Sequence, residues 1–300
     1  VKKSEGLSRR TGSPSTRDWA EAIQELRPSH RLDLLLQIKG MARSTFYYSR
    51  SGKRDKWAVE RKRTVEIYHE HQGRYGYRRI QAVMHKEGYV ISGKIVRRLM
   101  AEEGVKCEVR MKKYRSYKGE TGKIAPNLLE RNFKTDVPHR KLVTDVTEFH
   151  LFGKKLYLST VLDLYNGEIL YYTIYERPVL DMVLKMTEGT LKVIGRKTGA
   201  ILHSDQGWQY QHKDYQNLLR MNDLKQSMSR KGNCLDNACA ENFFGLLKSE
   251  LLYLQKFDSL EHFKMELEAY LKYYNEDRIK LRLGGMSPVQ YRLANQVMIS

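Results

Sequence analysis

Three closely spaced runs of β-branched and aromatic residues follow Lys141, and they constrain the fold more than any other part of the sequence. The runs are LVTDVTEFH, KKLYLSTVLDL and EILYYTIYE, and turns that contain glycine separate them. This pattern predicts three adjacent strands in an antiparallel meander. A helix over about 179–195 is expected next, then a short apolar strand in GAILHSDQG and a candidate fifth strand in KQSMS. The second half of the chain is therefore predicted to be an α/β domain.

Three carboxylates occupy informative places in this pattern. Asp145 lies inside the first predicted strand, Asp205 lies at the end of the fourth, and Glu241 lies in the first turns of a later helix, ENFFGLLKSELL. Asp236 or Asn237 is expected to cap that helix. Burying an unpaired carboxylate costs free energy, so such groups usually pair with cations or bind metal. Three other acids are expected to be ordinary edge or ion-paired residues: Glu148, Asp163 and Asp214.

Carboxylate oxygens favour Mg²⁺ or Mn²⁺ over zinc as ligands. Two such ions can activate a water or a DNA 3′-hydroxyl and stabilise the departing oxygen of a phosphodiester. The predicted cofactor is therefore Mg²⁺, with Mn²⁺ as a substitute and two ions per site. His203 and His212 flank Asp205, but no third nitrogen ligand stands at metal spacing, so we interpret His203 as structural.

Basic charge is concentrated in the first half of the chain. The formal net charge is +19; residues 1–140 hold 33 Lys and Arg against 16 Asp and Glu, whereas residues 141–300 hold 21 against 19. This segregation favours double-stranded DNA as the partner, ahead of an acidic membrane surface. The three cysteines show no zinc or disulfide spacing, and no apolar run has the length of a membrane span. We therefore expect a cytoplasmic protein without a membrane partner.

The basic N-terminal half is predicted to consist of small helical modules. The turn at Lys39-Gly40 separates two apolar helical patterns and indicates a helix-turn-helix, for which the alternative is a small structural helix pair. The predicted division of the chain is a disordered basic lead (1–17), a helix-turn-helix module (18–54), a second helical DNA-binding module (55–105), a basic linker (106–140) and the α/β domain with C-terminal helices (141–296).

Basic and aromatic residues in these modules are the DNA-binding candidates, because they suit phosphate contacts and stacking. In the first module they are Arg43 and Ser44. In the second module they are Arg74, Tyr75, Tyr77, Arg78, Arg97 and Arg98. The alternative for any one of them is a solvated basic surface.

The acidic residues also show a recognisable spacing. Asp205 and Glu241 enclose 35 residues, and Asp145…Asp205…Glu241 resembles the D,D-35-E triad of retroviral-type integrases and insertion-sequence transposases. Four local matches carry the resemblance: VTDVTEF, HSDQGWQY, SRKGNCLDNACAENFFGLLKSEL and YYNEDRIKLRLGGMSPVQYR. The resemblance runs from residue 30 to residue 296 and is closest to the OrfB-type insertion-sequence transposases with an integrase core.

This resemblance implies a ribonuclease H-like fold, which is a mixed five-stranded sheet flanked by helices. It implies that Asp145, Asp205 and Glu241 are the catalytic metal ligands for strand cleavage at terminal inverted repeats and for strand transfer into target DNA. Lys248, seven residues after Glu241 and so on the same helix face, matches a basic residue that the family places near the donor DNA end.

The family also implies partners and a setting. It implies a homo-oligomer that pairs the two element ends, a copy-out route through a circular intermediate, and work at the bacterial nucleoid. Members are often made as a frameshifted fusion with a small upstream DNA-binding protein. The start at Val1 leaves three alternatives open: an alternative start codon, a trimmed chain or a fragment of a longer fusion.

The sequence departs from the family pattern at two places. Leu142 and Val143 stand where a Trp is common, and Arg278-Ile279-Lys280 stands where Arg-x-His is frequent. The second departure leaves DNA contacts near the C-terminus open.

Two other questions stay open at this point. Trp208 and Tyr210 either stack on a DNA base or close the core beneath the site. Besides the transposase function, two alternative functions stay open at this stage. One is a DNA-binding regulator with an inactive core, and the other is a nuclease that cuts without joining. Retroviral integrase proper is disfavoured, because its His-His-Cys-Cys zinc module is absent from the sequence.

Overall fold

The structure is a computed structural model that describes residues 14–50, 55–109, 124–230 and 234–296. The chain divides into two compact units, residues 1–60 and residues 61–300. The helices predicted as a second DNA-binding module therefore belong largely to the same unit as the α/β domain. Most of the predicted lead and the middle of the predicted linker lie outside the described residues.

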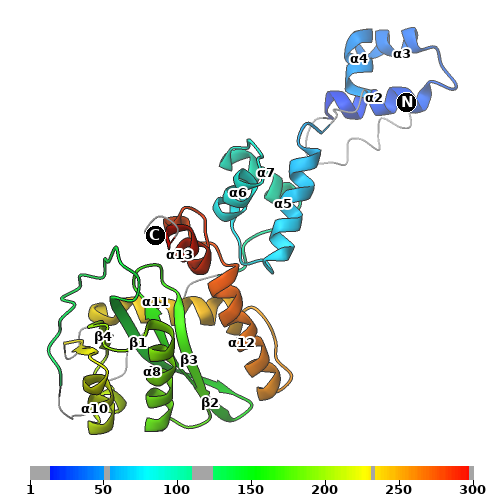
Figure 1. Ribbon diagram of the computed structural model, residues 1–300. Coiled ribbons are helices and arrows are strands. Elements are labelled where there is room, and N and C mark those ends of the chain that lie inside the picture. The colour runs from blue at the N-terminus through cyan, green and yellow to red at the C-terminus, as the bar shows by residue number, and fades with distance from the viewer. Residues whose placement is uncertain (1–13, 51–54, 110–123, 231–233, 297–300) are drawn as a thin grey trace. The chain divides into compact units, whose positions relative to one another are not determined.

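The first unit contains a small module of helices (Figure 1): α2 (Thr16–Leu26), α3 (Leu32–Lys39) and α4 (Arg43–Arg50). Ser15 caps α2, because its hydroxyl accepts the Asp18 N–H at 3.3 Å and the Asp18 carboxylate accepts the Ser15 N–H at 2.8 Å. The prediction of disorder as far as residue 17 was thus wrong at its end. Gly40, with φ of 69°, ends α3 at the predicted turn. The core of this unit is Ala20, Ile23, Leu36 and Phe46.

The second unit is built on a five-stranded mixed sheet in the order β3-β2-β1-β4-β5. Its strands are β1 (Lys141–Leu151), β2 (Lys154–Asp163), β3 (Ile169–Tyr175), β4 (Ile201–Ser204) and β5 (Lys225–Met228). Strand β2 runs antiparallel to both β1 and β3, whereas β4 runs parallel to both β1 and β5. The predicted meander and both later strands are confirmed.

The helices around the sheet are α8 (Leu180–Ile194), α9 (Trp208–Gln211), α10 (Lys213–Met221), α11 (Ala238–Leu247), α12 (Leu260–Glu276) and α13 (Pro288–Gln296). Short turns are the 3-10 segments η1 (Cys234–Asn237) and η3 (Leu281–Leu283) and the π-turn η2 (Lys248–Leu252). None of the described helices combines the length and the apolar character that crossing a membrane requires.

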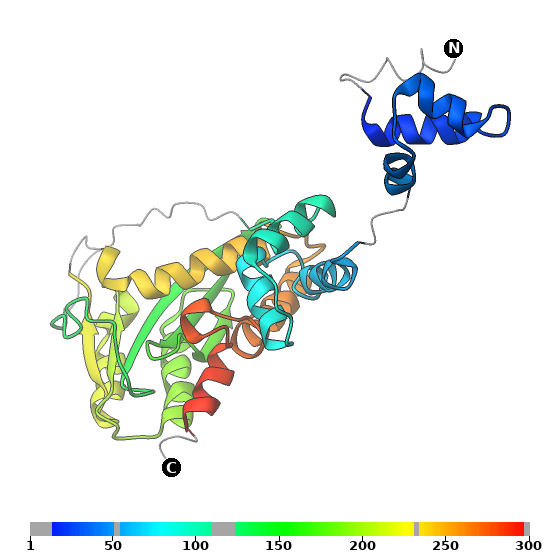
Figure 2. The same cartoon turned by 90° about the horizontal axis from the view of Figure 1, so that it is seen from above.

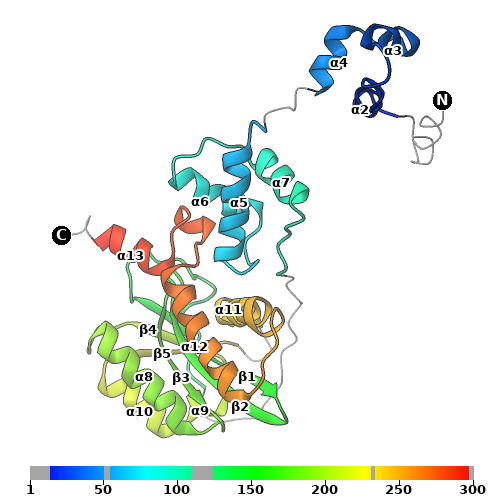
Figure 3. The same ribbon diagram turned by 90° about the vertical axis from the view of Figure 1, so that its right-hand side faces the viewer.

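Helices cover both faces of the sheet. Successive residues of a strand point to opposite sides, so each strand contributes to both cores. On β1, Leu142 packs in one core cluster with residues of α8 and α10, and Val143 packs in another with residues of α11 and α12. Figure 3 shows α8 and α10 on one side of the sheet and α11 and α12 on the other. The expected ribonuclease H-like arrangement is confirmed.

Helices α5 (Ala58–Glu70), α6 (Tyr77–Lys86) and α7 (Gly93–Glu102) precede the sheet in the chain. The buried apolar residues of α6 and α7 are Ile80, Met84, Val96, Leu99 and Met100. The segment that leads into α13 lies beside α6 (Figure 2), where the Lys86 ammonium group donates to the Gly285 carbonyl. The helical module is thus packed against the C-terminal part of the α/β unit.

Candidate active site

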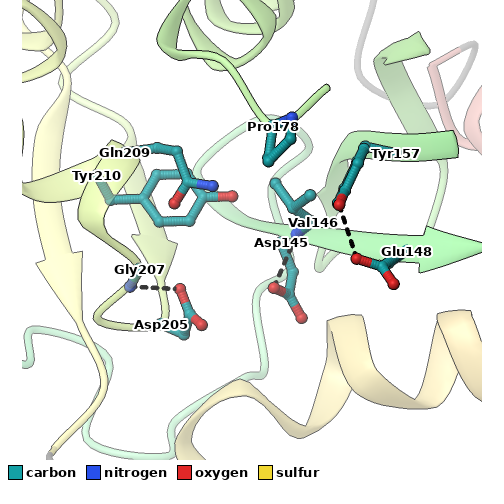
Figure 4. A pocket seen from close by; sticks show the side chains of 9 residues that line it. All are labelled: Asp145, Val146, Glu148, Tyr157, Pro178, Asp205, Gly207, Gln209 and Tyr210. Atoms are coloured by element: carbon teal, nitrogen blue, oxygen red, sulfur yellow. Dashed lines mark hydrogen bonds between the residues drawn. The ribbon is translucent and has the colours of Figure 1, made fainter. Parts of the chain in front are cut away.

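Two of the predicted carboxylates lie at the same level of neighbouring strands. Val143 of β1 pairs with His203 of the parallel strand β4. Asp145 and Asp205 each follow two residues later, Asp145 within β1 and Asp205 just past the end of β4, so the parallel register brings them together. Both line a pocket of about 170 Å³, and Figure 4 shows their carboxylates facing the same space.

Backbone amides hold both carboxylates in place. The Val146 N–H donates to Asp145 Oδ1 at 2.8 Å, and the Gly207 N–H donates to Asp205 Oδ1 at 2.8 Å. A Cβ on Gly207 would lie 2.9 Å from Gln209 Oε1 and 3.0 Å from Asp205 Oδ1. Glycine at position 207 therefore permits the turn that orients Asp205.

Glu241 lies in the first turn of α11 and is not among the residues that line this pocket. Burial raises the pKa of Glu241, and the negative charge of Asp205 adds to this effect. Burial also raises the pKa of Asp145 well above its usual range, and the charges of Asp205 and Glu241 reinforce it. Burial likewise raises the pKa of Asp205. The three carboxylates therefore lie within electrostatic reach of one another.

None of the three carboxylates forms a salt bridge with a cation among the described residues. In the same residues, no three His, Cys, Asp or Glu side chains already stand at metal-binding distance. The cluster nevertheless consists only of oxygen ligands, and its negative charges repel one another. These are the properties of a site that suits a hard divalent cation.

Lys248 is a basic residue whose charge acts on this cluster. Its ammonium group lies 5.7 Å from the centre of the Phe149 ring, and it acts electrostatically on Asp145. Burial lowers the pKa of Lys248, while the charges of Asp145 and Glu148 oppose that shift. The α-helix continues from Glu241 to Leu247 and Lys248 keeps right-handed helical dihedrals, so the seven-residue spacing applies up to Lys248, where a π-turn begins.

The other acids of the sequence have local partners. Glu148 lines the pocket but is exposed, and its carboxylate accepts from Tyr157 at 2.7 Å and from Lys155 at 3.1 Å. Asp163 accepts the backbone N–H groups of His139 and Tyr165. Asp214 is exposed, and its Oδ2 lies 3.6 Å from His212 Nδ1. Glu148 fits the expectation of an ordinary ion-paired acid, whereas Asp163 is buried and is held by backbone N–H groups, neither at a sheet edge nor in a described ion pair.

The aromatic pair after Asp205 divides between the two alternatives. Tyr210 is 1% exposed, and its hydroxyl lies 3.3 Å from the Thr144 hydroxyl beneath the site. Trp208 is 48% exposed. His203 is fully buried with its Nδ1 2.8 Å from the Ser227 hydroxyl, which fits a structural role. Tyr210 therefore closes the core, and Trp208 alone remains available for stacking.

Two predicted DNA contacts do not fit the structure. Arg74 and Tyr75 are 7% and 0% exposed. The Arg74 guanidinium donates to the Glu250 carbonyl at 3.0 Å, and the Tyr75 hydroxyl accepts the Ile279 N–H at 2.9 Å. Both side chains attach the helical module to the α/β domain and are closed to DNA. The pattern of basic and aromatic residues could not separate this packing from DNA binding, because burial depends on distant segments.

The remaining DNA-binding candidates are accessible. Ser44 is exposed, and so is Arg43, which pairs with Asp33. Tyr77 is half-buried beside the exposed Arg78. Two further candidates are exposed on α7: Arg97 and Arg98, the latter paired with Glu102.

Asp236 does not cap the helix that carries Glu241, contrary to one of the predicted alternatives. Its carboxylate accepts from Arg230 Nε at 3.0 Å, Arg131 Nε at 3.1 Å and Asn127 Nδ2 at 3.0 Å. Asn237 stands at the cap position, but its side chain makes no capping hydrogen bond. Asp236 instead ties the segment before the sheet to the start of α11. The basic linker composition was the only sequence signal for this role.

Replacing Asp236 with Asn is expected to lower the melting temperature at neutral pH, and by less in acid. The Arg230 guanidinium holds the pKa of Asp236 below its usual range. This stabilisation is therefore present above the unfolded pKa of about 3.9 and is lost as the pH falls through the folded pKa. Thermal unfolding of both proteins at neutral and at acidic pH measures it, with the exposed Asp258→Asn as control. A difference that persists undiminished below the folded pKa would argue against the ion pairs.

Comparisons with known proteins agree with this geometry. Models described as integrase core domain match residues 136–234 and 241–296, and a model described as HTH-like domain matches residues 57–113. The chain is 50% identical over 274 residues to the putative transposase InsK for insertion sequence element IS150 of Escherichia coli (strain K12), covering 91% of this chain and 97% of that protein. It is 46% identical over 209 residues to an uncharacterized transposase-like protein of Haemophilus influenzae, covering 69% and 95%.

Among solved structures, the catalytic core domain of HTLV-2 integrase in complex with magnesium aligns at 16% identity with a TM-score of 0.43, covering 52% of this chain and 97% of that one. The sequence matches show the class of protein, which is an enzyme with an integrase core joined to an HTH-like domain. With the long alignment to InsK, the chain belongs to the insertion-sequence transposases that carry this core.

Membership in this family makes the chain a DDE transposase that binds DNA and depends on a divalent metal. The HTH-like match falls on helices α5 to α7, which is the predicted second DNA-binding module, and not on the helix-turn-helix predicted over residues 18–54.

Proposed function

We propose that Asp145, Asp205 and Glu241 hold two Mg²⁺ ions, replaceable by Mn²⁺, and that this site cuts and joins DNA at the ends of an insertion sequence. The supporting observation is that three carboxylates act electrostatically on one another and, among the described residues, form no salt bridge; the β1–β4 register places two of them side by side. Bound there, the ions supply activation of the attacking hydroxyl and stabilisation of the departing oxygen.

Residues of the chain itself orient the carboxylates, hold the cations and bind the donor DNA. The amides of Val146 and Gly207 fix the two aspartates, so little reorganisation is needed when a cation arrives. Glu241 is partly exposed and reaches the cations through a change of side-chain rotamer. Lys248 holds a phosphate of the donor DNA end close to Asp145.

The helical modules grip the element ends through accessible side chains, which are Arg43, Ser44, Tyr77, Arg78, Arg97 and Arg98. The protein works as a homo-oligomer that pairs two ends, at the bacterial nucleoid where its substrate lies. A small upstream DNA-binding protein, supplied as a frameshifted fusion, completes the working enzyme.

Replacing Arg97 with Gln is expected to weaken DNA binding and to reduce the slope of log K against log salt by about one, because one phosphate contact is lost. The loss is expected to be equal for terminal-repeat and unrelated duplexes. Fluorescence anisotropy over a salt series measures the slope. Arg196→Gln, at an exposed arginine after α8, is the matched control. An unchanged slope would remove Arg97 from the DNA-binding surface.

Joining of a labelled, pre-cleaved terminal-repeat duplex to plasmid DNA tests the proposed reaction. We expect joined product with Mg²⁺ or Mn²⁺ and none with EDTA. Cleaved plasmid without joined strands would indicate a nuclease, and binding without either product would indicate a regulator.

A further inference from the structure

A π-turn follows the helix that carries Glu241. Residues Lys248–Leu252 form this turn, and the Tyr253 N–H donates to the Lys248 carbonyl, five residues back, at 2.9 Å. Such turns are rare, since the α-helical hydrogen bond is the more favourable one, and they often occur at functional sites. Contacts outside the turn must therefore hold it in place.

Glu250, in the middle of the turn, points into the protein and is 1% exposed. Its carboxylate accepts from Arg278 Nε and Nη2, each at 2.6 Å, and from the Tyr270 hydroxyl at 2.9 Å. Arg79 Nη1 lies 3.6 Å from Glu250 Oε1, and Arg74 donates to the Glu250 carbonyl oxygen. The segment 74–79 thus binds both the side chain and the backbone of one residue of the turn.

Lys248, two residues earlier, has different surroundings. It is half-buried, it lies over the Phe149 ring of β1, and the charges of Asp145 and Glu148 act on it. Residues two positions apart in a helix point to nearly opposite sides. One short turn therefore holds the lysine at the carboxylate cluster and the glutamate at the helical module.

Further buried contacts fix the module on the same side of the α/β domain. The His71 ring stacks on Tyr75 with 3.8 Å between centroids, and His71 Nδ1 lies 3.3 Å from the Tyr273 hydroxyl. Tyr75 also accepts the Ile279 N–H. The helical module is therefore docked through buried polar contacts that require a defined geometry.

We propose that Glu250 is a positioning residue that couples the docked helical module, residues 61–108, to Lys248. Docking holds the π-turn, and the π-turn sets the Lys248 ammonium group where the donor DNA end enters the site. The element that grips the DNA and the site that cuts it are thus aligned by one turn. This inference rests on the proposed role of Lys248 at the donor end.

A double-mutant cycle tests the coupling. Arg79→Gln removes the ion pair to Glu250 from the module's side, at a side chain that is 22% exposed. Lys248→Ala removes the positioned group. With saturating terminal-repeat duplex and Mg²⁺, we expect each change to lower the joining rate about tenfold, and the double variant to be no slower than Lys248→Ala alone. Fold-changes that multiply would overturn the proposal.

Arg63→Gln is the matched control. Arg63 pairs with Glu66, Glu70 and Glu87 inside the module and makes none of the contacts with the turn described above. Its fold-change is expected to multiply with that of Lys248→Ala. If it also fails to multiply, the lack of additivity is general and the coupling through Glu250 is refuted.

A second pair of variants acts on the turn itself. Glu250→Gln is expected to reproduce the Arg79→Gln result, and Tyr270→Phe, which removes one hydrogen bond to Glu250, carries the test if Glu250→Gln does not fold. Affinity for the duplex, measured in EDTA, is expected to change less than the joining rate in both. A loss confined to affinity would contradict positioning. Absence of joining by the wild-type chain would instead refute the proposed function.

Discussion

Replacing Asp145 with Asn is expected to abolish strand joining while leaving the metal-free protein at least as stable as the wild type. Loss of a ligand for the catalytic cations is expected to lower the rate by about 1000-fold or more, which corresponds to about 4 kcal/mol of transition-state stabilisation. Burial, with the charges of Asp205 and Glu241, raises the pKa of Asp145 well above its usual range. The ionised carboxylate therefore destabilises the fold in the absence of a cation.

The sign of this effect follows from linkage. A group whose pKa is higher in the folded state contributes stability that is present below its unfolded pKa and is lost as the pH rises through the folded pKa. Asparagine removes that loss. Thermal unfolding at neutral pH is expected to show Mg²⁺ raising the melting temperature of the wild type but not of Asp145→Asn. The exposed Asp214→Asn is the control and is expected to respond to Mg²⁺ like the wild type. A variant that still gains stability from Mg²⁺ would contradict the ligand assignment.

Replacing Arg278 with Met is expected to destabilise the protein by about 3–5 kcal/mol, because it leaves the Glu250 carboxylate buried without its main partner. Burial opposes ionisation of Glu250, but the hydrogen bonds from Arg278 hold its pKa below the usual range. The side chains of Arg278 and Glu250 are 2% and 1% exposed, so water cannot replace the lost contacts.

Urea unfolding measures this loss. The double variant Arg278→Met with Glu250→Met is expected to recover part of the stability, since the unpaired charge is then gone. Arg292→Met, which breaks the more exposed pair with Glu168, serves as the graded control and is expected to cost less. A loss below about 1 kcal/mol in Arg278→Met, the range of surface ion pairs, would contradict the burial of this pair.

The strands and the carboxylate cluster could be predicted from the sequence because their signals are local. Runs of alternating and β-branched residues predict the strands. Asp145 and Asp205 each lie two residues after one of the paired residues Val143 and His203. The resemblance added Glu241 and Lys248.

The packing roles of other residues depend on segments far apart in the chain. The interleaved basic and aromatic residues predict DNA contacts at Arg74 and Tyr75, but these side chains are buried against Glu250 and Ile279, which lie 176 and 204 residues further along the chain. The π-turn at Lys248 was also not predictable, since no residue type in KSELL marks it. Arg278, noted only as part of a departure from the family pattern, proved to be a buried ion-pair partner.

The most direct test of the central claim is the joining of a labelled, pre-cleaved terminal-repeat duplex to plasmid DNA in Mg²⁺ by the wild type, Glu241→Gln and the control Asp214→Asn. We predict joined product from the wild type and the control and none from Glu241→Gln, although all three bind the duplex. Joining by Glu241→Gln at the wild-type rate would show that the carboxylate cluster of Asp145, Asp205 and Glu241 is not the catalytic site.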